Sequence, residues 1–176
     1  MMLWDVFLNA FSAPLAAVTA SASMLTKINF PRESIILAGI AQTSFGAIVR
    51  LALIVVALVW FQVPWSTSMV AAPLGVAALI LFGFAAGLLL VPVGLLYQDV
   101  SRSTGLLHMA LFFVTPVIYP PPVLGTAAIL MRWNPIAPLL TTTREALTTG
   151  RLTCLREFLL VVGIGVFLLL FAWLTY

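Results

Sequence analysis

The stretch from Leu51 to Gln98 reads LALIVVALVWFQVPWSTSMVAAPLGVAALILFGFAAGLLLVPVGLLYQ and contains no charged residue. As one helix, its 48 residues would extend about 72 Å, whereas the hydrocarbon core of a bilayer is about 30 Å thick. The stretch is therefore too long for one membrane crossing and must reverse once. The segment FQVPWSTS at Phe61–Ser68 is typical of a turn. The sequence thus predicts two adjacent transmembrane helices, at about 34–60 and 69–97.

The composition of the whole chain places it in the same class. Of its 176 residues, 63% are apolar and 7% are charged, and the mean hydropathy is +1.20. Soluble domains contain about 25% charged residues. The net charge of +3 comes from scattered residues and lacks the clustered basic surface of a nucleic-acid-binding protein. We therefore expect an all-α integral membrane protein without a nucleic-acid partner.

Three further apolar tracts have the length or the position of membrane helices. They cover about 5–26, 103–119 and 158–176, which brings the expected number of spans to about five. The first residues, MMLWD, lack the basic region of a signal peptide. We therefore expect the first tract to remain in the protein as a helix.

The region 120–156 resembles neither a span nor a polar loop. Its apolar pieces are interrupted by Pro, Gly and Arg, and each is too short to cross a bilayer, which favours a re-entrant helical hairpin before the last span. The hydroxyls of Thr141–Thr143, followed by Glu145, are typical of a helix start. We therefore predict that a helix begins near Thr141.

Counting the crossings assigns the basic residues to two sides of the membrane. The first side carries Lys27, Arg32 and Arg102, and the second carries Arg132, Arg144, Arg151 and Arg156. The positive-inside rule mildly favours the second side as cytoplasmic. A re-entrant region can hold arginines for reasons other than topology, so charge alone leaves the orientation open.

Two features inside the spans each have two interpretations. Gly83 and Gly87 form a GxxxG pattern, which allows close helix approach either within one bundle, the commoner case, or at a dimer interface. Arg50 lies deep in the span at 34–60. Because a charge is costly there, it is expected either to face a polar interior or to extend toward the far headgroups.

The residues that could support catalysis are few. The chain has one histidine and five carboxylates, and its only lysine, Lys27, is not part of a G-x-x-x-x-G-K-[ST] nucleotide-binding loop. Asp99 and His108 are nine residues apart across an expected helix start, which is poor geometry for a catalytic pair. We predict no catalytic residue, no metal site and no cofactor in this chain. If ATP drives the protein, another chain binds it.

Four motifs in order resemble a known family. They are LTKINFPRESI at 25–35, YQDVSR at 97–102, FFVTPVIYPPP at 112–122 and WNPIAPLLTTTREAL at 133–147. Their order and spacing are similar to those of the permease subunit of type-2 ABC transporters that export polysaccharides, including O-antigen, capsule and teichoic acid. The resemblance extends from Trp4 to the end of the chain.

The resemblance implies a role for each motif. The segment 27–33 would be the coupling helix that contacts a separate ATPase, although a solvated turn remains the alternative. In the second cytoplasmic loop, Gln98 replaces an arginine that is frequent in the family. The implied site residues are Lys27, Phe30, Pro31, Arg32 and Glu33 for coupling; Asp99 and Arg102 in the second cytoplasmic loop; Gln42, Thr43, Ser44 and Arg50 as channel-facing candidates; and Pro116, Tyr119, Asn134, Pro135 and Arg144 in a re-entrant gate.

The implied assembly is a homodimer of permeases with two ATPase subunits that bind ATP and Mg²⁺. It would move a lipid-linked or undecaprenyl-linked polysaccharide across the bacterial inner membrane, in contact with membrane lipids. Family members begin with an amphipathic gate helix and one more transmembrane helix, which we expect this sequence to lack. The alternatives are a type-2 ABC permease for drugs or lipids and an integral membrane enzyme of glycan assembly, which would need polar catalytic groups gathered at one membrane face.

Overall fold

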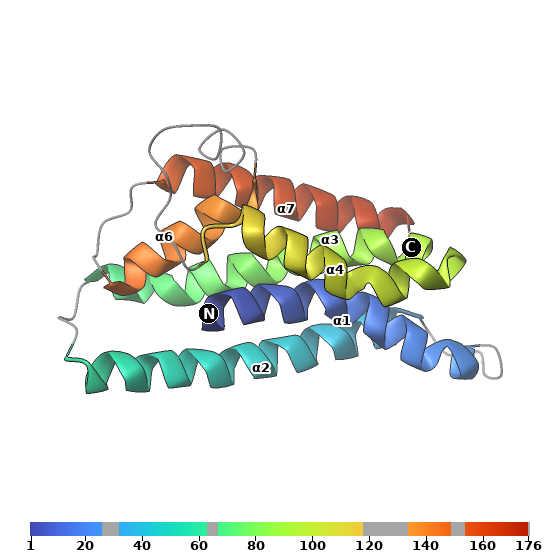
Figure 1. Cartoon of the computed structure of the whole chain (residues 1–176), viewed down its shortest axis with the longest axis horizontal. Helices are drawn as coiled ribbons and strands as arrows, with labels where there is room; N and C mark the ends of the chain where they lie inside the picture. Colours follow the sequence, from blue (N-terminus) through green and yellow to red (C-terminus); the bar gives the residue numbers. More distant parts are fainter. Residues whose placement is uncertain (26–31, 63–66, 118–133, 149–153, 176) are drawn as a thin grey trace.

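The computed structural model describes residues 1–25, 32–62, 67–117, 134–148 and 154–175. The regular structure of these residues is helical (Figure 1), which confirms the predicted all-α fold. The helices are α1 (Met2–Leu25), α2 (Arg32–Trp60), the 3₁₀ helix η1 (Thr67–Ala71), α3 (Ala72–Leu96), α4 (Gln98–Val114), α6 (Ile136–Thr148) and α7 (Leu155–Thr175).

Four helices within the described ranges are long and apolar enough to cross a membrane. They contain the segments Met2–Ser21, Leu37–Trp60, Ser68–Leu96 and Leu155–Leu174. The fourth predicted span, 103–119, corresponds to α4, which begins earlier, at Gln98, and ends at Val114. Its apolar part, Ser103–Val114, is shorter than the others. The predicted reversal at Phe61–Ser68 falls between the end of α2 and the start of α3.

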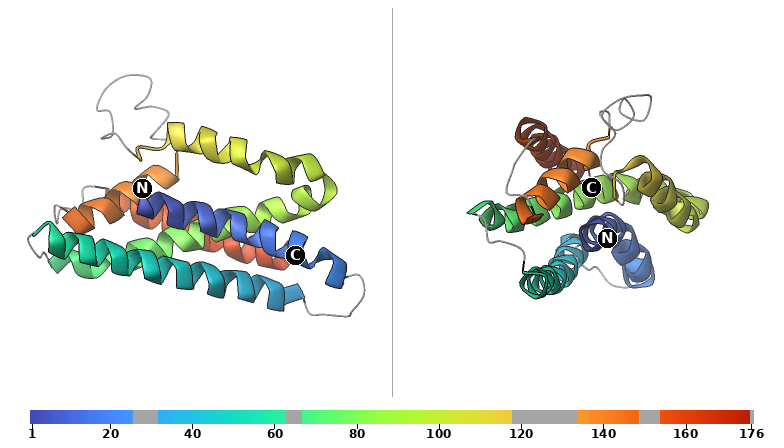
Figure 2. Two further views of the ribbon diagram at one scale, coloured as in Figure 1. Left: turned by 60° about the horizontal axis from the view of Figure 1, so that its bottom comes forward. Right: turned by 60° about the vertical axis from the view of Figure 1, so that its left-hand side comes forward.

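Helix α3 lies at the centre of the bundle, between α1 and α2 on one side and α6 and α7 on the other (Figures 1 and 2). Its sequence is apolar around the whole circumference, as expected for a helix that is surrounded by others. The main core joins side chains from four helices: Trp4, Phe7 and Phe11 of α1, Leu79 and Phe82 of α3, Leu139 and Leu140 of α6, and Phe158 of α7.

The two glycines of the GxxxG pattern bring α3 against the backbone of α1. A Cβ atom on Gly87 would lie 2.2 Å from the carbonyl oxygen of Phe11, and one on Gly83 would lie 2.9 Å from that of Phe7. Only a residue without a side chain fits at such a distance. The pattern therefore serves packing within this chain, which is the first of the two interpretations.

The ends of successive helices lie at alternate ends of the bundle, as the crossing count requires. The end of α1, the start of α2 and the junction of α3 with α4 lie at one end (Figure 1). At that junction a single extended residue, Tyr97, reverses the chain. The end of α2, the start of α3 and helix α6 lie at the opposite end.

The prediction that a helix begins near Thr141 is wrong. Helix α6 begins five residues earlier, at Ile136, and Thr141–Thr143 lie buried in its middle. The Oγ1 of Thr141 donates to the carbonyl oxygen of Ala137 at 2.8 Å, and that of Thr143 donates to the carbonyl oxygen of Leu139 at 2.6 Å. In an apolar interior such bonds within the helix satisfy a hydroxyl that could otherwise cap a helix start.

Candidate gate region between α4 and α6

Asn134 joins the end of α4 to the start of α6. Its Oδ1 accepts a hydrogen bond from the backbone N–H of Ile136 at 2.9 Å, which caps α6. Its Nδ2 donates to Thr115 Oγ1 at 2.8 Å and lies 3.4 Å from the carbonyl oxygen of Val114. Both ends of the buried amide are thus used. One side chain therefore fixes the position of α6 relative to α4.

The segment Thr115–Val117 leaves α4 as a turn inside the bundle. The N–H of Thr115 still donates to the carbonyl oxygen of Leu111 at 3.0 Å, and the N–H of Val117 donates to the carbonyl oxygen of Thr115 at 2.7 Å. Between them Pro116 has no N–H to donate, which stops the helix. All three residues are buried. Thr115 is the polar member of this turn, and Asn134 supplies its partner.

Arg144 forms the second connection between α6 and this turn. Its Nη2 donates to the carbonyl oxygen of Val117, and its own carbonyl oxygen accepts from Thr148 Oγ1 at 2.9 Å. The side chain is half-buried. The structure thus brings together three of the predicted gate residues, Pro116, Asn134 and Arg144. Pro135 follows Asn134 and is exposed, and Tyr119 lies outside the described residues.

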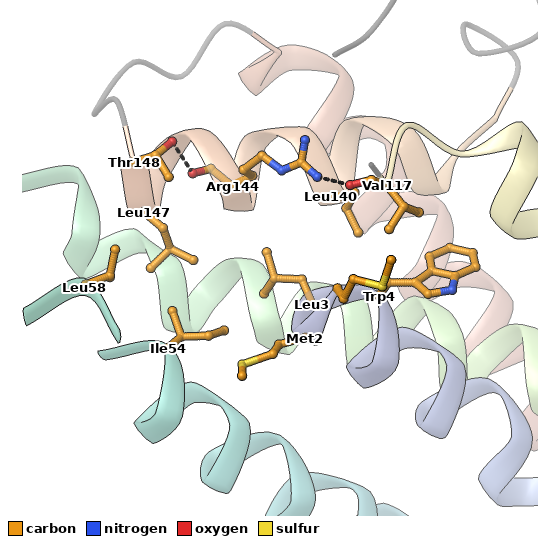
Figure 3. A pocket seen from close by; sticks show the side chains of 11 residues that line it. Met2, Leu3, Trp4, Ile54, Leu58, Val117, Leu140, Arg144, Leu147 and Thr148 are labelled. Carbon is orange, nitrogen blue, oxygen red and sulfur yellow. Dashed lines mark hydrogen bonds between the residues drawn. The ribbon is translucent and has the colours of Figure 1, made fainter. Parts of the chain in front are cut away.

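A cavity of about 220 Å³ lies beside this region. Figure 3 shows Arg144 along the edge formed by α6, with side chains of α1 and α2 facing it across the space. The remaining walls are largely apolar. The lining residues are Met1, Met2, Leu3, Trp4, Ile54, Leu58, Val117, Leu140, Arg144, Leu147 and Thr148.

Two of the five predicted coupling residues, Arg32 and Glu33, belong to described helix, and they lie at the opposite end of the bundle. Lys27, Phe30 and Pro31 lie outside the described residues, whereas Arg32 and Glu33 are the first two residues of α2. Helix α2 therefore begins two residues before the predicted span at 34–60. Asp99 and Arg102, the residues predicted for the second cytoplasmic loop, lie in the first turns of α4, at the same end of the bundle (Figure 1).

The structure does not gather the channel-facing candidates of α2 on one face. Thr43 is buried and donates to the carbonyl oxygen of Gly39 at 2.8 Å, whereas its neighbour Gln42 is exposed and Ser44 is half-buried. Adjacent helical residues point about 100° apart, so three in a row cannot share a narrow surface.

Arg50 lies on the same side of α2 as Ala47 and Thr43, three and seven residues before it, and is half-buried. Its Nη1 lies 3.2 Å from the carbonyl oxygen of Gly46, one turn earlier. A side chain that extended toward the headgroups beyond Trp60 would point toward the C-terminal end of α2 instead. In the structure the Arg50 side chain is therefore not extended toward the far headgroups.

His108 is half-buried in α4, and its ring lies edge-on to Phe11 of α1, with the ring centroids 5.7 Å apart. Its Nε2 is buried without a hydrogen-bond partner among the described residues. Within the described ranges, no three His, Cys, Asp or Glu side chains are close enough to hold a metal ion.

No family model matches the sequence. Two curated proteins do, and each is an O-antigen export system permease protein RfbA of Klebsiella pneumoniae. One is 25% identical over 151 residues, which cover 85% of this chain, and the other is 23% identical over 168 residues, which cover 94%. The chain resembles O-antigen export permeases.

This match confirms the predicted similarity to type-2 ABC permeases, and with the apolar helices it identifies a multi-pass bacterial membrane protein. The chain spans 58% and 64% of the lengths of the two permeases.

Sequence reasoning missed the partners of two of the predicted gate residues. It singled out Asn134 and Arg144 but not Thr115 and the Val117 carbonyl group, to which they bond. The available signal was a threonine followed by proline directly after an apolar helix, since the hydroxyl of a buried threonine at a helix end needs a partner. The sequence offered no means of choosing that partner.

Replacing Asn134 with alanine is expected to lower the free energy of unfolding by about 2 kcal/mol. The change removes the cap of α6, worth about 1 kcal/mol, and leaves the buried Thr115 hydroxyl with one bond fewer. Thermal unfolding of the detergent-solubilised protein measures the effect. Asn9→Ala on α1 is the matched control, because that exposed side chain donates to the carbonyl oxygen of Asp5, one turn earlier in the same helix. Equal losses in the two variants would contradict the role of Asn134.

Proposed function

We propose that the chain is the channel-forming permease subunit of an ATP-driven exporter that moves a lipid-linked polysaccharide across the bacterial inner membrane. The observation that carries this proposal is the similarity to two O-antigen export permeases over 85% and 94% of the chain. The helical bundle of apolar spans supports it. On this proposal two copies of the chain form the channel, and the polysaccharide is the cargo.

In this proposal a separate ATPase subunit binds ATP and Mg²⁺ and docks on the segment 27–33. The start of α2 at Arg32 and the start of α4 lie together at one end of the bundle, which supports a shared docking surface there (Figure 1). ATP binding can drive the permease only if the ATPase favours one arrangement of the helices over another. The contact must therefore differ between the two states.

Helix α4 provides a route from that docking end to the gate region. It begins at Gln98, at the same end of the bundle as the start of α2, and ends at Val114, where Asn134 joins it to α6 (Figure 2). A single helix can pass a displacement along its length. We therefore propose that movement at Asp99 and Arg102 reaches α6 through α4, and that the two hydrogen-bonded connections of α6 belong to the gate.

Co-purification with the candidate ATPase tests this proposal. Arg32→Glu and Phe30→Ala are expected to reduce the ATPase recovered with the tagged permease at least tenfold, because one reverses a charge and the other removes an aromatic anchor of the kind that is enriched at interfaces. The amount of ATPase per permease is read from stained gels.

Arg156→Glu is the control for the charge reversal. Arg156 is exposed at the start of α7, at the end of the bundle opposite to the proposed docking surface, and its reversal is expected to leave the recovery of the ATPase unchanged. Undiminished recovery with both Arg32→Glu and Phe30→Ala would overturn the coupling role of segment 27–33.

A further inference from the structure

An apolar groove separates the second half of α2 from α6 and α3. Next to the cavity of about 220 Å³ lies another of about 110 Å³. The two share Ile54 and Leu58 of α2 and Leu147 of α6. They therefore adjoin along one side of α2, and we refer to the pair as the α2–α6 groove.

The walls of this groove match a hydrocarbon chain. The smaller cavity is lined by Leu51, Ile54, Val55, Leu58, Met69, Ala72, Pro73, Val76 and Leu147, none of which is charged. Empty space beside such side chains forfeits dispersion contacts. In a membrane the nearest molecules able to restore those contacts are lipid chains, because water gains nothing in a space that lacks polar partners.

The larger cavity adds a positive charge at the edge of the groove. Arg144 extends along this edge (Figure 3), and Thr148 is its neighbour one turn later. The guanidinium has five N–H donors, of which the structure uses one, on Nη2, for the carbonyl oxygen of Val117. Among the described residues no carboxylate pairs with it. The remaining donors suit the oxygens of a phosphate group.

The depth of the groove agrees with this chemistry. Trp60 ends α2 and is 82% exposed, and tryptophan prefers the headgroup level of a membrane. Leu58 and Ile54 lie two and six residues before Trp60, which corresponds to about 3 and 9 Å along the helix. A lipid whose phosphate lies at the headgroup level can therefore place its chain between α2 and α6.

We propose that the α2–α6 groove binds an anionic glycerophospholipid of the surrounding membrane. One acyl chain lies along Ile54, Leu58 and Leu147, and the phosphate accepts hydrogen bonds from Arg144. The positive charge at the edge complements an anionic headgroup, and the apolar surface within the groove complements an acyl chain. The charge therefore favours this lipid over a zwitterionic one. Because Arg144 also bonds the turn after α4, the bound lipid would stabilise the gate region.

Lipid-dependent thermal stability tests this proposal without any export assay. The detergent-solubilised chain is titrated with phosphatidylglycerol or with phosphatidylcholine of the same acyl chains. Phosphatidylglycerol is expected to raise Tm by several degrees more than phosphatidylcholine, since a ligand that binds only the folded state stabilises it. Arg144→Gln is expected to abolish that difference, with an apparent Kd for phosphatidylglycerol at least tenfold weaker. Arg144→Lys, which keeps the charge, is expected to retain part of it.

A second pair of variants tests the chain-binding part of the groove. Ile54→Trp fills the space where the two cavities adjoin, and is expected to abolish the response to both lipids. Val56→Trp, at a position on α2 that is 63% exposed and lines neither cavity, is expected to leave both responses intact. Arg156→Gln is the matched control for loss of charge.

Three results would overturn the proposal. The first is an equal rise in Tm of the unaltered chain with both lipids. The second is a loss of the phosphatidylglycerol preference in Arg156→Gln that is as large as the loss in Arg144→Gln. The third is saturable binding of undecaprenyl phosphate with none of phosphatidylglycerol, which would assign the groove to a glycan carrier. Because the measurement involves neither ATPase nor transport, its outcome is independent of the proposed function.

Discussion

Alanine at position 87 is expected to lower the free energy of unfolding by about 2 to 3 kcal/mol, although alanine favours helices by about 1 kcal/mol over glycine. Its Cβ atom would lie 2.2 Å from the carbonyl oxygen of Phe11 and 3.0 Å from the carbonyl carbon. These are backbone atoms that no rotamer change can move. Helices α1 and α3 would have to separate, and overpacking of this kind typically costs 1–3 kcal/mol. Reversible unfolding in mixed detergent measures the change.

Gly163→Ala is the matched control for this prediction. Gly163 lies in α7, where an added Cβ would have no neighbour within 4 Å. The substitution is therefore expected to be neutral or to stabilise the protein by up to about 1 kcal/mol. Similar stability changes in the two variants would mean that α1 and α3 do not approach each other as closely as the structure has them.

The second large effect is expected at the contact of α3 with α6. A Cβ atom on Gly75 would lie 2.3 Å from Thr143 Oγ1, 2.8 Å from its Cγ2 and 2.9 Å from its Cβ. Rotation of the threonine cannot relieve a contact with its Cβ, so Gly75→Ala is expected to destabilise the protein by about 2 kcal/mol. The unfolding measurement used for position 87 applies here.

A double-mutant cycle identifies the cause of this loss. Thr143→Ala removes the Oγ1 and Cγ2 atoms that the new methyl group would meet. The pair Gly75→Ala with Thr143→Ala is therefore expected to be more stable than the sum of the two single changes by about 1 kcal/mol, as found for residues in direct contact. Strict additivity would place the origin of the destabilisation elsewhere.

The fold could be predicted because membrane insertion leaves few solutions for an uncharged sequence. A tract from Leu51 to Gln98 without charge has to cross, turn and cross again, and the structure has the two long helices α2 and α3 over this tract. The hydroxyl run Thr141–Thr143 led to an error because a threonine serves equally well as a cap or as a buried residue bonded to its own helix. Local sequence does not distinguish the two.

The candidate site could be predicted only as a set of residues, not as an arrangement. The family resemblance singled out Pro116, Asn134 and Arg144, which the structure brings to one turn. Their partners depend on how α6 folds back on α4, and this is a tertiary property. The channel-facing candidates on α2 shared a short polar stretch of sequence, yet Gln42 and Thr43 point in different directions because a helix turns by about 100° per residue.

The close approach of α1 and α3 at Gly83 and Gly87 determines which parts of the bundle can change position. Two helices whose backbones touch have no intervening side chains that could adopt other rotamers, so any sliding between them must break several contacts at once. We therefore expect α1 and α3 to move as one rigid body. Helix α4, whose described side chains at 103–114 are mostly exposed, packs less tightly against the bundle than α1, α2 or α7 does. If the chain works as the permease proposed above, movement between its states is therefore expected at α4, with the α1–α3 pair as the fixed frame.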